Sequence, residues 1–148
     1  MATSQQGYGM MTLALFLSRC SLGLYFFFAG IGKIKSGVEA FYKGGFTSLK
    51  PLWLPDWFAM PYGHALPFVE VLVGVALIVG FYGRLAAAVA ALALVSFTIA
   101  LYQAGAFFPE KGGPFHSNVI LLTLAFLLAV TGPGTFSVDS FRGRSTSR

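Results

Sequence analysis

Four long apolar blocks fill most of this chain of 148 residues, and the few ionisable residues lie inside these blocks or at their ends. A helix needs roughly 20 apolar residues to cross about 30 Å of hydrocarbon. In that solvent every backbone N–H and C=O group must be satisfied within its own segment, so each block is predicted to be a helix. The sequence therefore predicts an all-α integral membrane protein, a four-helix bundle that forms a single domain over residues 1–148.

The composition agrees with a membrane setting. Hydrophobic residues make up 56% of the chain and charged residues only 10%, which is too little polar surface for a water-soluble globule of this size. The net charge of +5 comes from basic residues at span ends and in the tail. We therefore expect the lipid bilayer and its anionic head groups as partners, and no nucleic acid.

We expect the transmembrane spans at residues 12–34, 67–82, 85–104 and 115–131. The connection over residues 36–66 is rich in proline, tryptophan and tyrosine, which favours a short amphipathic helix and an ordered interfacial loop in the head-group layer. Pro67 is expected in the first turn of the second span, where proline is tolerated. Only Gly83 and Arg84 separate the second span from the third, which predicts a tight antiparallel helical hairpin.

Small residues are expected to let the helices approach closely. In the third span, Ala86 and Ala90 are spaced to face one neighbour. The glycines predicted to mark helix contacts are Gly23, Gly30, Gly32, Gly74 and Gly80. Four spans also place both termini on one face, and arginines in the tightest loop and in the tail favour cytoplasmic termini.

Several polar groups share one level of the membrane, near the two longer loops. At 1.5 Å of rise per residue, Lys33 ends the first span there and Glu70 lies about one turn inside the second. A carboxylate below the head groups is costly unless it is paired, so Glu70 is expected to face inward and meet Lys33 or a histidine. Two interpretations stay open: an ion pair that orders the helices, and a ligand or proton-transfer site.

His64, Gln103 and His116 share this level. Two imidazoles there could ligate a haem, bind a quinone carbonyl or relay protons, or they could be ordinary interfacial polar residues. We treat these three residues as candidate contacts for a quinone head group, with Lys33 and Glu70 setting the polar layer. No catalytic residue and no metal site is assigned, since no motif indicates one.

Arg19 lies nearer the terminal face, too far along the helix axis to pair with Glu70. Its candidate partners are Asp139 after the Gly-Pro-Gly turn, C-terminal carbonyls of a neighbouring span, and a lipid phosphate. A structural role is the favoured interpretation. The residues expected in structural ion pairs are therefore Arg19, Lys33, Glu70 and Asp139.

Three segments resemble the DoxX family of small four-helix membrane proteins: SRCSLGLYFFFAGIGKI, VEVLVGVALIVGFYGR and NVILLTLAFLLAVTGPGTFSVD. The resemblance rests on Arg19 and Lys33 with glycines between them, on Glu70 and Arg84 with glycines between them, and on the terminal Gly-Pro-Gly turn. The DoxX family is named for a subunit of thiosulfate:quinone oxidoreductase. The resemblance implies a subunit of a quinone-linked oxidoreductase in a prokaryotic cytoplasmic (inner) membrane.

Two functions follow as hypotheses. The first is a membrane subunit of a quinone-linked electron-transfer complex that contributes to a quinone or proton site and is not an enzyme alone. The second is a non-catalytic accessory subunit that assembles with a larger membrane complex through its small-residue faces and aromatic loop. Other subunits of a redox complex, or further copies of the chain, are the expected protein partners.

Overall fold

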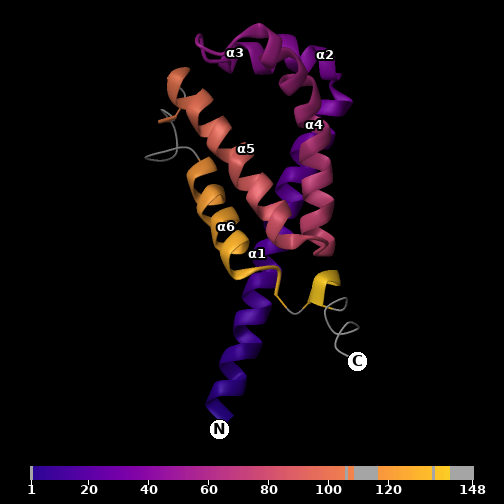
Figure 1. Cartoon of the computed structure of the whole chain (residues 1–148), viewed down its shortest axis with the longest axis vertical. Coiled ribbons are helices and arrows are strands. Elements are labelled where there is room, and N and C mark those ends of the chain that lie inside the picture. Colours follow the sequence, from indigo (N-terminus) through magenta and orange to yellow (C-terminus); the bar gives the residue numbers. More distant parts are fainter. Residues whose placement is uncertain (1, 106, 109–116, 135, 141–148) are drawn as a thin grey trace.

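The structure, a computed structural model, describes residues 2–105, 107–108, 117–134 and 136–140, with side chains from Gly7 onward. Its helices are α1 (Ala2–Lys35), α2 (Val38–Ala40), the π-helix η1 (Phe41–Phe46), α3 (Thr47–Leu49), α4 (Asp56–Val79), α5 (Gly83–Gln103) and α6 (Asn118–Thr131). Figure 1 shows their arrangement. The described residues contain no strand, so the prediction of an all-α fold is confirmed.

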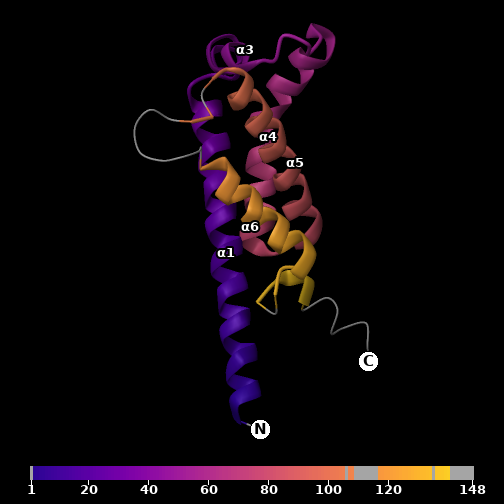
Figure 2. The same ribbon diagram turned by 90° about the vertical axis from the view of Figure 1, so that its left-hand side faces the viewer.

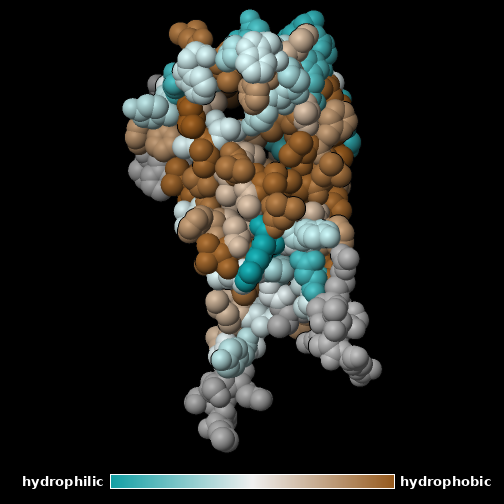
Figure 3. Space-filling model, in the orientation of Figure 1, coloured by the Kyte–Doolittle hydropathy of each residue, from teal (hydrophilic) through white to brown (hydrophobic). Residues whose placement is uncertain are grey.

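Three helices, α1, α4 and α5, are long and apolar enough to cross a membrane, whereas α6 is an apolar helix of only 14 residues. The chain is therefore a multi-pass membrane protein, and the count of four spans stays a prediction. With 34 residues, α1 is about 50 Å long. Its N-terminal turns project past the other helices (Figures 1 and 2). Hydrophobic residues cover the middle of the face drawn in Figure 3.

The long helices form two pairs. α1 packs along α4 and α5 packs along α6, whereas α4 and α5 share far less contact and diverge from the turn that joins them (Figure 1). The second and third spans are thus joined by the predicted short turn, but they do not pack closely along their lengths. The turn itself comprises residues 80–82, and Gly83 and Arg84 already belong to α5.

Glycines hold α1 and α4 at backbone contact. A Cβ at Gly74 would lie 2.6 Å from the backbone nitrogen of Phe27, and a Cβ at Gly30 would lie 2.6 Å from the carbonyl oxygen of Pro67. No larger residue fits such an approach, which explains why these helices pair. The prediction of a helix contact is wrong for Gly32, whose Cβ would have no neighbour within 4 Å. It is confirmed for Gly23, Gly30 and Gly74.

Alanines play the same part between α5 and α6. Ala87 and Ala90 are completely buried, in a core that also contains Ala125 and Leu128 of α6. The small-residue face of α5 is thus used inside the chain. The same core continues to the α1–α4 pair through Phe26 and other buried apolar side chains.

The connection between α1 and α4 is more helical than the sequence predicts. Residues 38–49 form one helical segment, here called the cap, which lies over one end of the bundle (Figures 1 and 2). The helix α4 begins at Asp56, so Pro67 lies inside it, and its predicted place in a first turn is wrong. The reason is tertiary: the Tyr42 ring of the cap packs so closely on Gly63 that a Cβ there would lie 2.7 Å from it.

Candidate functional site

A cavity of about 570 Å³ lies between the two helix pairs, beneath the cap. It is lined by residues of α1, η1, α3, α4 and α5, by the first residue of α6, and by Lys50, Pro51, Trp53 and Leu54 of the connection between α3 and α4. Most of the lining is apolar or aromatic. The face of the molecule that is drawn in Figure 3 has a hollow just below its upper end. The polar side chains of the lining include Tyr25, Lys33, Tyr62, Glu70, Ser96 and Asn118.

The buried carboxylate of Glu70 is the main charged group of the cavity wall. Its residue is only 2% exposed, and its Oε1 accepts a hydrogen bond from Lys33 Nζ. Among the described residues, Oε2 has no hydrogen-bond partner. The backbone contact of α1 and α4 at Gly30 brings the long Lys33 side chain within reach of this carboxylate. One oxygen of this buried carboxylate therefore has a hydrogen-bond donor, and the other has none among the described residues.

The ammonium of Lys33 has two further neighbours. Its Nζ lies 5.1 Å from the centre of the Phe41 ring and 5.3 Å from that of the Phe97 ring. A cation at these distances is attracted to the negative face of an aromatic ring. Lys33 is thus held by α4, η1 and α5 at once, which connects the cap to both helix pairs.

A second polar contact joins the helix pairs across the cavity. The hydroxyl oxygens of Tyr62 and Ser96 lie 2.6 Å apart, and Ser96 donates to the carbonyl oxygen of Ala93 at 2.7 Å. Because Ser96 has a single hydroxyl hydrogen, Tyr62 must donate to Ser96. Both hydroxyl hydrogens are therefore already engaged in hydrogen bonds. The oxygen lone pairs that remain can still accept hydrogen bonds.

The structure does not place His64 at the cavity. Its Nδ1 donates to the carbonyl oxygen of Met60 and its Nε2 donates to Glu39, each at 2.8 Å. The imidazole also packs against the Tyr42 ring, with 4.5 Å between ring centres. Both ring nitrogens are occupied on the outside of α4, so this histidine is not available to a haem iron or a quinone.

The other two predicted ligand contacts do not join the site either. Gln103 is exposed and lines a separate surface hollow of about 500 Å³ next to Trp53. His116 lies outside the described residues. Of the five residues predicted to bind a cofactor, the structure brings together Lys33 and Glu70.

Tyr62 and Ser96 were missed by reasoning from the sequence. The sequence places Tyr62 in the interfacial connection over residues 36–66, which hid its position in α4 at the cavity. Ser96 gave a weak signal, because a single serine in an apolar span can also bond to its own helix, as Ser96 does through Ala93.

The opposite end of the molecule holds the second buried charge, Arg19. This residue is 1% exposed, and it donates to the carbonyl oxygens of Pro133 at 2.8 Å and of Phe136 at 2.6 Å. Both carbonyls belong to the segment that follows α6. The neighbouring Gly80 has a left-handed backbone (φ 75°), and a Cβ there would lie 2.6 Å from Arg19 Nη1.

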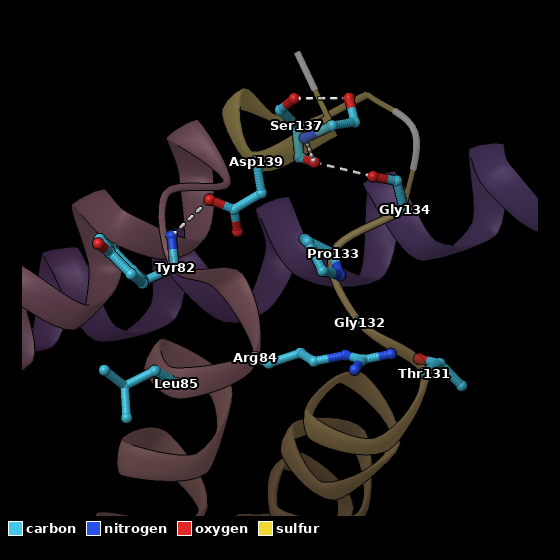
Figure 4. A pocket seen from close by; sticks show the side chains of 10 residues that line it. Tyr82, Arg84, Leu85, Thr131, Gly132, Pro133, Gly134, Ser137 and Asp139 are labelled. Carbon is cyan, nitrogen blue, oxygen red and sulfur yellow. Dashed lines mark hydrogen bonds between the residues drawn. The ribbon is translucent and has the colours of Figure 1, made fainter. Parts of the chain in front are cut away.

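Asp139 closes the same end without contacting Arg19 in any hydrogen bond of the described region. Its carboxylate accepts the backbone N–H of Tyr82 at 2.9 Å (Figure 4). It also accepts the backbone N–H of Gly83 at 2.8 Å. The first N–H groups of a helix need acceptors from outside the helix, and a carboxylate at the start of α5 also opposes the positive end of the helix. Arg19 and Asp139 thus have different partners. Both attach the C-terminal segment to the bundle.

The comparison with protein families gives one match. A family model described as methylamine utilisation protein MauE matches residues 11–131. No curated protein and no solved structure matches the chain. The resemblance to the DoxX family is therefore wrong, because the matching model is that of a different membrane family. Charges separated by glycines are what closely packed membrane helices need in general, so they do not distinguish one such family from another.

Proposed function

The chain belongs to the MauE family of methylamine utilisation proteins, and from this premise we propose that it is an accessory membrane subunit of a redox system whose cavity binds a quinone head group. The observation that carries the proposal is the Glu70 carboxylate, which is buried at the cavity wall with one oxygen lacking a partner among the described residues. A polar atom left in this state inside a membrane protein marks a candidate ligand site.

The size and walls of the cavity suit a flat, lipid-soluble molecule. Ligand pockets commonly measure roughly 300 to 1,000 Å³, and about 570 Å³ accommodates a substituted quinone ring with the first part of its tail. Aromatic side chains of the cap and of α4 and α5 offer stacking surfaces. They are Phe41, Phe46, Phe58 and Phe97.

The position of the cavity suits entry from the bilayer. Val69 of α4 and Leu92 and Ile99 of α5 line the cavity and are also exposed on the outer surface. These helices diverge below the cap (Figure 1). An isoprenoid tail can therefore stay in the lipid between α4 and α5 while the head group reaches Glu70.

The second hypothesis, a purely structural accessory subunit, loses part of its basis. It relied on the small-residue face of α5 as a surface for a partner, but that face is buried against α6. It is retained as the outcome expected if the cavity binds nothing.

The test is ligand retention and titration. The full chain would be purified from native membrane in mild detergent, its extract analysed for quinones by mass spectrometry, and a short-tailed quinone titrated by calorimetry. Ala93→Phe places a ring in the cavity and should weaken quinone binding at least tenfold. Val130→Phe adds the same bulk at an exposed position of α6 away from the cavity and should leave binding unchanged.

Two results would overturn the proposal. One is a wild-type protein that retains no quinone and shows no saturable binding. The other is an Ala93→Phe variant that is folded, with a thermal transition like that of Val130→Phe, and still binds quinone as the wild type does.

A further inference from the structure

We propose that this cavity prefers the reduced form of its ligand, a quinol with hydroxyl groups, over the quinone. The inference rests on the proposed function and concerns which redox form the same site selects. It follows from the hydrogen-bonding capacity that the described polar groups leave open.

The first observation is at Glu70. An ionised carboxylate can only accept hydrogen bonds. Oε1 already accepts from Lys33, and Oε2 is buried without a partner in the described part of the chain. The vacant position at this carboxylate therefore calls for a donor. A quinol hydroxyl supplies one, whereas a quinone has only carbonyl oxygens to offer.

The second observation is at the Tyr62–Ser96 pair. The hydroxyl hydrogens of both residues are used, one between them and one on Ala93. The oxygen lone pairs of Tyr62 remain, so this contact too can accept and cannot donate without rearranging. Tyr25 and Asn118 carry both donors and acceptors, and they fit either redox form.

The donors of Lys33 do not reverse this balance. Its ammonium is held by Glu70 and lies over the rings of Phe41 and Phe97. The ammonium of Lys50, which also lines the cavity, is held by Asp56. Lys33 also neutralises Glu70, so a cationic ligand such as an amine would bring an unbalanced positive charge into the cavity. A neutral molecule that donates hydrogen bonds is the chemistry that fits.

The size of the preference for the quinol follows from the free energy lost when a quinone carbonyl oxygen faces the Glu70 carboxylate. A hydrogen bond to a charged group is stronger than a neutral one, and a carbonyl oxygen set against a carboxylate leaves that charge without a partner. We expect the quinol to bind about tenfold to a hundredfold more tightly than the matching quinone. For a two-electron couple this ratio raises the reduction potential of the bound pair by about 30 to 60 mV.

The experiment compares one short-tailed compound in its two redox forms. The quinone and the chemically prereduced quinol are titrated anaerobically into the full-length protein, and the potential of the bound couple is measured in parallel by spectroelectrochemistry. Both readings use the wild-type chain, so they do not depend on a variant that folds. Tighter quinol binding together with a raised potential supports the inference.

A matched pair of variants locates the preference. Glu70→Gln turns an amide N–H toward the cavity that can donate to a quinone carbonyl, so the preference should fall to below about threefold or reverse. Glu39→Gln makes the same chemical change on an exposed cap residue that does not line the cavity, and the preference should persist. A folded Glu70→Gln protein with an unchanged ratio would overturn the role of Glu70.

The remaining outcomes separate the two proposals. Wild-type protein that binds the quinone as tightly as the quinol, or more tightly, overturns the inference while the proposed function stands. Wild-type protein that binds neither form overturns both.

Discussion

Arg19 and Glu70 are both almost completely buried, yet the two ends of the molecule in which they lie use charge in different ways. The guanidinium of Arg19 donates to two backbone carbonyls and ties down the segment after α6. The carboxylate of Glu70 accepts one hydrogen bond from Lys33 and leaves its second oxygen beside a cavity. The comparison teaches that burial alone does not identify a functional charge. Each group keeps one buried polar atom without a partner among the described residues, Nε of Arg19 and Oε2 of Glu70. What distinguishes the two ends is the cavity that Glu70 lines.

The largest effect on stability is expected at Arg19. Arg19→Met should lower the free energy of unfolding by about 3 kcal/mol, because two hydrogen bonds to a charged donor are lost and two carbonyls lose their partner. Reversible unfolding in mixed micelles would measure this. Arg84→Met, at an exposed arginine of the same end, is the control and should change the value by less than about 0.5 kcal/mol. Equal losses in the two variants would refute the structural role of Arg19.

The next effect tests how tightly the Arg19 end is packed. Gly80→Ala should cost about 2 kcal/mol, because its left-handed backbone disfavours a side chain and its Cβ would meet Arg19 and Ser137. Gly105 has a similar φ of 71° but no neighbour within 4 Å of a Cβ. Gly105→Ala should therefore cost only the backbone part, about 1 kcal/mol. Unfolding curves that give the two variants the same loss would contradict the close packing around Arg19.

A smaller effect on stability is expected at the Glu70 end. Replacing both partners, in Lys33→Met with Glu70→Leu, should change the free energy of unfolding by at most about 1 kcal/mol, because a buried pair exchanged for apolar residues is often neutral. Quinol binding should nevertheless fall at least tenfold, because the acceptor for its hydroxyl group is lost. Glu70→Leu alone should be less stable than the double variant, since it leaves Lys33 without its partner. A double variant that loses as much free energy of unfolding as Arg19→Met would contradict the expected difference in stability between the two ends.

The smallest effect concerns the exposed cap. Hydrogen bonds from His64 and then from Lys43 hold the pKa of the Glu39 carboxyl below its usual value. Because the pKa is lowered, the stabilisation that these hydrogen bonds give is present above the pKa of Glu39 in the unfolded chain. It is lost as the pH falls through the pKa of Glu39 in the folded chain. The difference in melting temperature between wild type and Glu39→Gln should therefore be small at neutral pH and vanish in acid. A difference that grows as the pH falls would contradict the assignment.

Reasoning from the sequence reached part of the site and missed part. Lys33 and Glu70 could be placed at one level from helix geometry alone, because both lie near the same end of the membrane in the spans predicted at residues 12–34 and 67–82. His64 could not be excluded in this way, since one of its two hydrogen bonds goes to Glu39, a distant residue that the cap brings to it. Tyr62 was hidden because α4 begins at Asp56, inside the segment that was predicted as an interfacial connection between two spans.

The sequence by itself determined the all-α class and the membrane setting, because the length and apolar character of a segment act locally on its own backbone. Only the tertiary structure decided that α1 pairs with α4 and α5 with α6, since that choice depends on glycines and alanines of different helices meeting at backbone distance. It also decided that Arg19 donates to two carbonyls of the segment after α6, while Glu70 is bound to Lys33 in the wall of a cavity. The hydrogen bonds of a side chain depend on the residues that the fold brings around it, and most of these residues are not its neighbours in the sequence.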